Sequence, residues 1–156
     1  MKIDKNSVVL PLPGEEIYAY KENKWRVKLP ESYKKFIGIY NGGIPFEKSF
    51  LCNSRNYAIE RFLCILKDPK ENPFGVYDIS VVLTQIGERL TANEDLLGAE
   101  VLPIASLFAG DFICLDFRDK QKEASICVWS HEESGEFAPI TYRVADNFND
   151  FINMVK

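Results

Sequence analysis

The order of the periodic segments constrains the fold of this chain more than any single motif does. Apolar residues recur at helical spacing near both ends and once in the middle, and between these helices lie runs of short, strand-like segments joined by charged or Gly-containing turns. Helices that are separate from runs of consecutive strands favour an antiparallel sheet over a parallel βαβ sheet. The sequence therefore predicts a single α+β domain over residues 1–156, an antiparallel β-sheet flanked by about four α-helices.

The expected strands form two groups. A hairpin or meander precedes a Pro- and charge-rich turn at 67–75, and a second meander follows the helix that Asp78 is placed to cap. The length of 156 residues suits one domain, and no internal repeat divides it. The expected strands cover about residues 49–53, 58–65, 102–104, 112–117, 125–130 and 141–144.

The expected helices are marked by apolar stripes and caps. A short first helix covers about residues 14–23, and a clearer one begins near Pro30, carries a possible Glu31–Lys35 pair and ends at Asn41-Gly42-Gly43. The last helix is capped by Asp146 or Asn147. We expect the aromatic side chains on the core faces of these helices to be mostly buried, namely Tyr33, Phe36, Phe148 and Phe151.

The four cysteines are too widely spaced for a metal knuckle, and no signal for export precedes them. We expect four small, buried, reduced side chains, Cys52, Cys64, Cys114 and Cys127, in a cytoplasmic protein. The longest apolar runs are far shorter than the roughly 20 residues that a membrane span requires. No metal or cofactor is expected.

Five ordered blocks of the sequence carry a family resemblance. The segment Leu29-Pro30-Glu31-Ser32-Tyr33-Lys34-Lys35-Phe36-Ile37, followed by Tyr40-Asn41-Gly42-Gly43-Ile44-Pro45, resembles the opening of the SUKH superfamily. The likeness continues through residues 102–105, 110–116, 128–132 and 144–152, with Ser130 where the family often has Asp. It is weakest over residues 49–93.

The resemblance implies a compact immunity domain that binds and neutralises a polymorphic toxin, in many cases a nuclease with a basic surface. A second interpretation is an intracellular scaffold or regulator, like the eukaryotic members of the superfamily. A third is a small hydrolase that uses a cysteine or a carboxylate. The implied partner is a toxin domain, and the protein itself is expected to be a monomer or a weak homodimer.

The residues alone indicate no reaction centre. His131 is the single histidine, and a pair with Cys127 is formally possible, but a strand cysteine normally lacks the electropositive setting that activates a thiol. Asp111, Asp116 and Asp119 lack the spacing of an EF-hand loop. An ion pair between Asp116 and Arg118 on one strand face explains that pattern more simply.

The charge distribution is the most informative functional signal. The chain carries a net charge of −4, which makes nucleic acid and anionic membranes poor partners. The segment 111–136 contains seven acidic and three basic residues, so it carries the whole of this charge. We expect it to form or border a surface for a basic partner, with Trp129 as an aromatic anchor if exposed. The candidate partner-binding residues are Asp111, Asp116, Asp119, Glu123, Trp129, His131, Glu132, Glu133 and Glu136.

Overall fold

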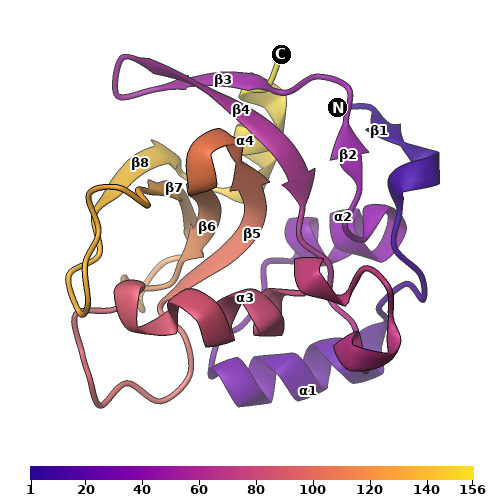
Figure 1. The fold of residues 1–156 in the computed structure, drawn as a ribbon, viewed down its shortest axis with the longest axis horizontal. Helices are drawn as coiled ribbons and strands as arrows, with labels where there is room; N and C mark the ends of the chain where they lie inside the picture. Colours follow the sequence, from indigo (N-terminus) through magenta and orange to yellow (C-terminus); the bar gives the residue numbers. More distant parts are fainter.

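A computed structural model describes all residues 1–156 and shows a six-stranded antiparallel sheet with helices on both of its faces (Figure 1). The sheet follows the chain order from β3 to β8 without a crossover, as the short connections predict. The helices are α1 (Glu15–Trp25), α2 (Glu31–Tyr40), α3 (Ile79–Ile86) and α4 (Phe148–Met154). The sheet strands are β3 (Ser49–Cys52), β4 (Arg55–Phe62), β5 (Val101–Leu107), β6 (Phe112–Asp116), β7 (Ser125–Trp129) and β8 (Thr141–Ala145).

Two short strands lie outside this sheet and were not predicted. β1 (Ile3–Asp4) pairs with β2 (Ile44–Pro45), so the N-terminus lies beside the segment that follows α2. The C-terminal Lys156 exchanges two backbone hydrogen bonds with Ser49, each 2.8 Å long, at the start of β3. Both termini therefore lie at the same end of the molecule (Figure 1). None of the helices combines the length and the apolar character that crossing a membrane requires.

The main core lies between one face of the sheet and the helices α2 and α4. Phe148 of α4 packs edge-on against Tyr33 and Phe36 of α2, with ring centroids 5.3 Å apart in both pairs. Phe151 packs edge-on against Phe50 of β3 at 5.4 Å. Tyr33, Phe148 and Phe151 are buried as predicted, and Phe36 is partly buried.

A second, smaller core covers the opposite face of the sheet. Cys114 of β6 and the β7 residues Cys127 and Trp129 alternate with side chains of the main core, and they pack beneath Leu90. Leu83 and Ile86 of α3 also pack against them. All four cysteines are buried and free, as the sequence predicted.

Local capping follows the sequence closely. One carboxylate oxygen of Asp78 accepts from the amides of Ser80 and Val81, which begins α3, and its other oxygen accepts from Leu66 at 2.9 Å. Asn147, rather than Asp146, caps α4 by accepting from the amide of Asp150. Gly42 has a φ of +68°, the left-handed conformation expected where α2 ends.

Several boundaries differ from the prediction for tertiary reasons. The segment 58–65 leaves the sheet after Phe62, because Cys64 pairs with the residues that lead into α3 instead. β5 extends to Leu107 because its last residues also pair with β4 and β6, and its register against β6 shifts between Pro103 and Ala105. Glu31 pairs with Lys34 at 2.9 Å and not with Lys35, since Lys34 also faces Glu22.

Candidate partner-binding surface

The acidic segment 111–136 forms a hairpin, so the structure divides its charges between two ends of the sheet. Asp111 precedes β6 and lies beside His131 after β7, whereas Asp116 and the turn 117–124 lie at the other end. Five residues of extended chain separate Asp111 from Asp116 by about 17 Å. The candidate residues therefore do not form one continuous patch.

The turn end of the hairpin is electrically balanced. Asp116, Asp119 and Glu123 are matched by Arg118, Lys120 and Lys122. The net charge of −4 therefore comes from the other end, where Asp111 lies beside the segment 131–136, which we call the acidic loop. That loop contributes Glu132, Glu133 and Glu136, whose side chains are exposed.

Arg89, in the short 3-10 turn η4 (Gly87–Arg89), holds the acidic loop in place. Its guanidinium donates to the carbonyl oxygens of His131 and Ser134 and lies 3.2 Å from Nδ1 of His131. The amide of Phe137 donates to the carbonyl of Glu88 at 2.7 Å. Asp111 accepts from the amide of His131 at 2.7 Å. The loop is thus tied on both sides and presents its carboxylates from an ordered backbone.

Trp129 is not an exposed anchor, so that part of the sequence interpretation is corrected. Its side chain is 0% exposed and lies in the second core beneath Leu90. The indole Nε1 donates to the carbonyl of Arg89 at 2.8 Å, and the Arg89 guanidinium lies 5.0 Å from the ring centroid. Trp129 therefore supports the loop from below, because α3 and η4 cover the sheet face on which it lies.

The acidic side chains of the loop differ in whether they form hydrogen bonds within the chain. The Tyr142 hydroxyl donates to Glu133, with oxygen distances of 2.8 and 2.7 Å, and this hydrogen bond raises the pKa of Tyr142. Glu133 also bonds Ser130. Glu132 and Glu136 form no such side-chain hydrogen bonds or ion pairs and are exposed. These two are the charges most available to a partner.

The predicted pair between Asp116 and Arg118 is confirmed at the turn end. Nη2 of Arg118 lies 2.8 Å from Oδ2 of Asp116, and its Nε donates to Oδ1 at 2.9 Å. Burial by itself raises the pKa of Asp116, but the hydrogen bonds and charge of Arg118 outweigh it, so the pKa lies below its usual value. This carboxylate is engaged within the chain.

This ion pair predicts a pH dependence of stability. Because the pKa of Asp116 is lower in the folded state, its contribution is present above the unfolded value and is lost as the pH falls below about 4. We expect Arg118→Met to lower the free energy of unfolding at neutral pH, with the difference from wild type shrinking in acid. Urea denaturation across pH measures it, with Lys70→Met as control, because Lys70 is exposed and takes part in no ion pair. Parallel curves for wild type and Arg118→Met would contradict the assignment.

The residues of the hydrolase interpretation are not arranged as a reaction centre. Cys127 is buried against Cys114 in the second core, whereas His131 is exposed and faces Arg89. Burial raises the pKa of the Cys114 thiol, the opposite of what a nucleophile requires. No group of three His, Cys, Asp or Glu side chains is arranged to hold a metal ion.

Comparison with known proteins identifies the family. A family model named SUKH_6 and described as SMI1-KNR4 cell-wall matches residues 15–152, from the start of α1 into α4. The chain belongs to the SUKH superfamily. No curated protein and no solved structure matches the sequence.

In this SUKH domain, the opening blocks that carry the resemblance are structural. Leu29, Tyr33 and Asn41 are buried, and Gly42 and Gly43 lie so close to Val9 and Ile3 that an added Cβ would clash. These residues join α2 to the N-terminal segment and to the end of β4. They therefore support the fold and are not accessible at the surface.

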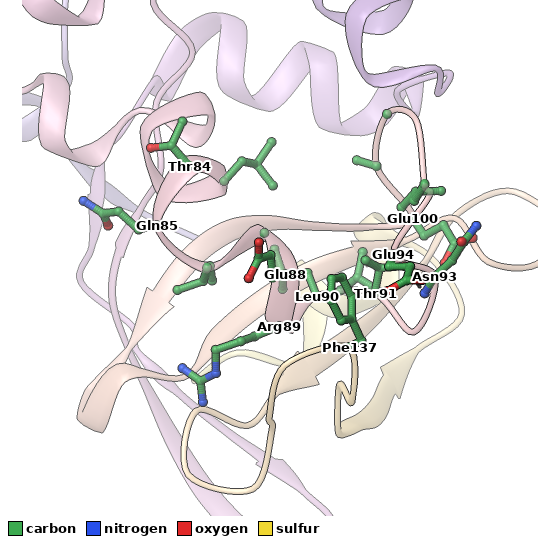
Figure 2. Close-up of a pocket in the computed structure, with 17 residues that line it drawn as sticks. Thr84, Gln85, Glu88, Arg89, Leu90, Thr91, Asn93, Glu94, Glu100 and Phe137 are labelled. Atoms are coloured by element: carbon green, nitrogen blue, oxygen red, sulfur yellow. Dashed lines mark hydrogen bonds between the residues drawn. The ribbon is translucent and has the colours of Figure 1, made fainter.

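The sequence analysis did not predict a hollow that borders the acidic loop. Glu88, Arg89 and Phe137 line a hollow of about 610 Å³ between the C-terminal end of α3, the segment 91–100 and the start of β5 (Figure 2). Glu94 and Glu100 line it as well. The one signal for this site in the sequence is the excess of acidic residues in the segment 88–100, which has four acidic residues and one basic residue. The walls of the hollow come from parts of the chain that are far apart in sequence, so no local pattern predicts it.

Proposed function

We propose that this SUKH domain is an immunity protein that binds a basic toxin domain and neutralises it by covering its active site. One observation carries the proposal. The entire net charge of the chain corresponds to four carboxylates at one end of the β6–β7 hairpin, and Arg89 and Phe137 hold the loop that bears most of them. A fixed negative surface accelerates association with a basic partner and disfavours nucleic acid. Membership of the SUKH superfamily supports a protein-binding role for this charged surface.

A second candidate function is regulation by binding a cellular protein. The description of the matching family model, SMI1-KNR4 cell-wall, favours it. The same charged surface would then meet a basic host protein. Expression beside the candidate toxin distinguishes the two functions, because an immunity protein restores growth to cells that produce the toxin domain encoded next to its gene, and a regulator does not.

The charge proposal predicts the effect of Glu132→Gln/Glu136→Gln. We expect association with the neighbouring toxin domain to slow about three- to tenfold at low salt and its salt dependence to flatten, because steering weakens when rim charges are removed. The melting temperature should stay nearly unchanged, since exposed charges contribute at most about 1 kcal/mol each. Surface plasmon resonance and thermal denaturation measure both quantities.

The matched control is Glu16→Gln/Glu71→Gln, which changes the net charge equally at exposed positions outside this end of the hairpin. Glu133 is left intact because its bond to Tyr142 would confuse charge with loop structure. If both double variants bind at the same rate as wild type, the acidic loop is only a solvated surface. If neither wild type nor control binds the toxin or protects cells, the immunity function itself is wrong.

A further inference from the structure

The hollow beside the acidic loop has a lining suited to a long basic side chain. Its lining contains apolar groups from three separate segments of the chain, namely Ile86 and Leu90, Leu96, and the ring of Phe137. Figure 2 shows Leu90 and Phe137 among them. Glu88, Glu94 and Glu100 complete the lining. An aliphatic stem and a cationic head would meet matching surfaces in it.

The three glutamates of the hollow are available to a ligand. None of the four ion pairs of the structure includes Glu88, Glu94 or Glu100. The charge of Glu100 helps to raise the pKa of Arg118, but the Arg118 guanidinium forms its ion pair with Asp116 and not with Glu100. Arg89 is the single base in the lining, and its guanidinium extends away from the other lining side chains and bonds carbonyls of the acidic loop (Figure 2).

Two other hollows of the molecule have a smaller excess of acidic side chains or none. One of about 690 Å³ at the start of α1 has Glu15, Glu16 and Asp68 opposed by Lys21 and Lys67. Another, of about 510 Å³ beside the β6–β7 turn, has more basic than acidic side chains. The hollow next to the acidic loop is thus the one of the three with the largest excess of acidic over basic side chains.

The walls are held in position before any partner binds. The amide of Ala99 donates to the carbonyl of Trp25 at 2.8 Å, and Gly98, with a φ of +89°, approaches α1 so closely that a Cβ would lie 2.4 Å from that carbonyl oxygen. The backbone amide of Phe137 donates a hydrogen bond to the carbonyl oxygen of Glu88, which holds Phe137 against η4. A preformed hollow costs little ordering entropy on binding.

We propose that this hollow receives an arginine or lysine side chain of the protein partner that the acidic loop attracts. The inference rests on the proposed function for the kind of partner, and it adds the place where the partner is anchored. The hollow and the loop share Glu88, Arg89 and Phe137 as a common border, so one partner surface covers both. The loop then sets the rate of encounter, and the buried basic side chain sets the lifetime of the complex.

The test uses the full chain and small probes, so it does not depend on any toxin. In ¹H–¹⁵N NMR titrations, N-acetylarginine methylamide should cause saturable shifts at the amides of Gly87, Gly98 and Phe137. The citrulline analogue has nearly the same shape without the charge and should cause none. Glu88→Gln/Glu100→Gln should weaken the arginine probe at least about fivefold, because each lost carboxylate removes a charge-assisted contact. Glu15→Gln/Glu16→Gln, in the hollow at α1, should leave its affinity unchanged.

Three kinds of outcome in the probe experiments would overturn the proposal. Equal shifts with the citrulline probe would show that charge is not recognised, and shifts elsewhere or an unchanged affinity in Glu88→Gln/Glu100→Gln would remove the hollow as the site. Tighter binding of spermidine than of the arginine probe at the same amides would assign the hollow to a free polyamine. Arginine binding without any toxin recognition would refute the immunity function and leave the pocket standing.

Discussion

Asn41→Asp is expected to destabilise the fold by about 3 to 5 kcal/mol at neutral pH, since it places an uncompensated charge in the interior. Asn41 is 0% exposed. Its Nδ2 donates to the carbonyls of Val9 and Ile65 at 3.1 and 3.3 Å, and its Oδ1 accepts from the amide of Ile65 at 2.8 Å. A carboxylate accepts hydrogen bonds but cannot donate them, so one of its oxygens would face the carbonyl oxygens of Val9, Pro11 and Ile65.

Urea denaturation measures this loss of stability. Comparison with two further variants separates the effect of the new charge from the effect of losing the amide hydrogen bonds. Asn41→Ala leaves the same backbone groups unsatisfied without a charge, so it should be destabilising but less so at neutral pH. The Asp variant should regain part of its stability in acid, where protonation removes the charge and restores one donor. Asn149→Asp, in the exposed first turn of α4, serves as control and should be neutral or slightly stabilising. Equal stability of wild type and Asn41→Asp would contradict the described amide network.

Phe151→Ala is expected to cost about 3 to 5 kcal/mol, because it leaves a cavity in the main core. The ring is 0% exposed and lies between Phe50 of β3 and Phe148 of α4, at centroid distances of 5.4 and 6.5 Å. These neighbours come from elements far apart in sequence, so they cannot move together to fill the space without shifting β3 or α4. For a chain of this length we expect the melting temperature to fall by about 10 °C or more.

Phe108→Ala is the matched control for this variant. Its ring is 73% exposed at the end of β5, so removing it should change the melting temperature little. Phe36→Ala should lie between the two, because Phe36 is partly exposed but packs against Phe62 at 4.7 Å. Thermal denaturation by circular dichroism ranks the three variants. A melting temperature for Phe151→Ala equal to that of Phe108→Ala would show that the ring does not support the core.

The sequence by itself determined the four helices, the six strands of the main sheet and their order. The apolar spacing of α2, the cap at Asp78 and the glycine that ends α2 each involve residues within a few positions of one another. Antiparallel pairing also follows locally, because each pair of neighbouring strands is consecutive in the chain and needs no crossover. The ion pair at Asp116 is local in the same sense, because Arg118 lies two positions away.

Only the tertiary structure decided which side chains are available for recognition. Whether Trp129 is exposed depends on α3 and η4, which cover its face of the sheet from more than thirty positions away in the chain. The acidic segment behaves as two separate ends because hairpin pairing brings Asp111 to His131 and removes both from Asp116. The hollow exists only where α3, the segment 91–100 and Phe137 meet. Burial and local field depend on contacts between distant segments, and no local window of sequence contains those contacts.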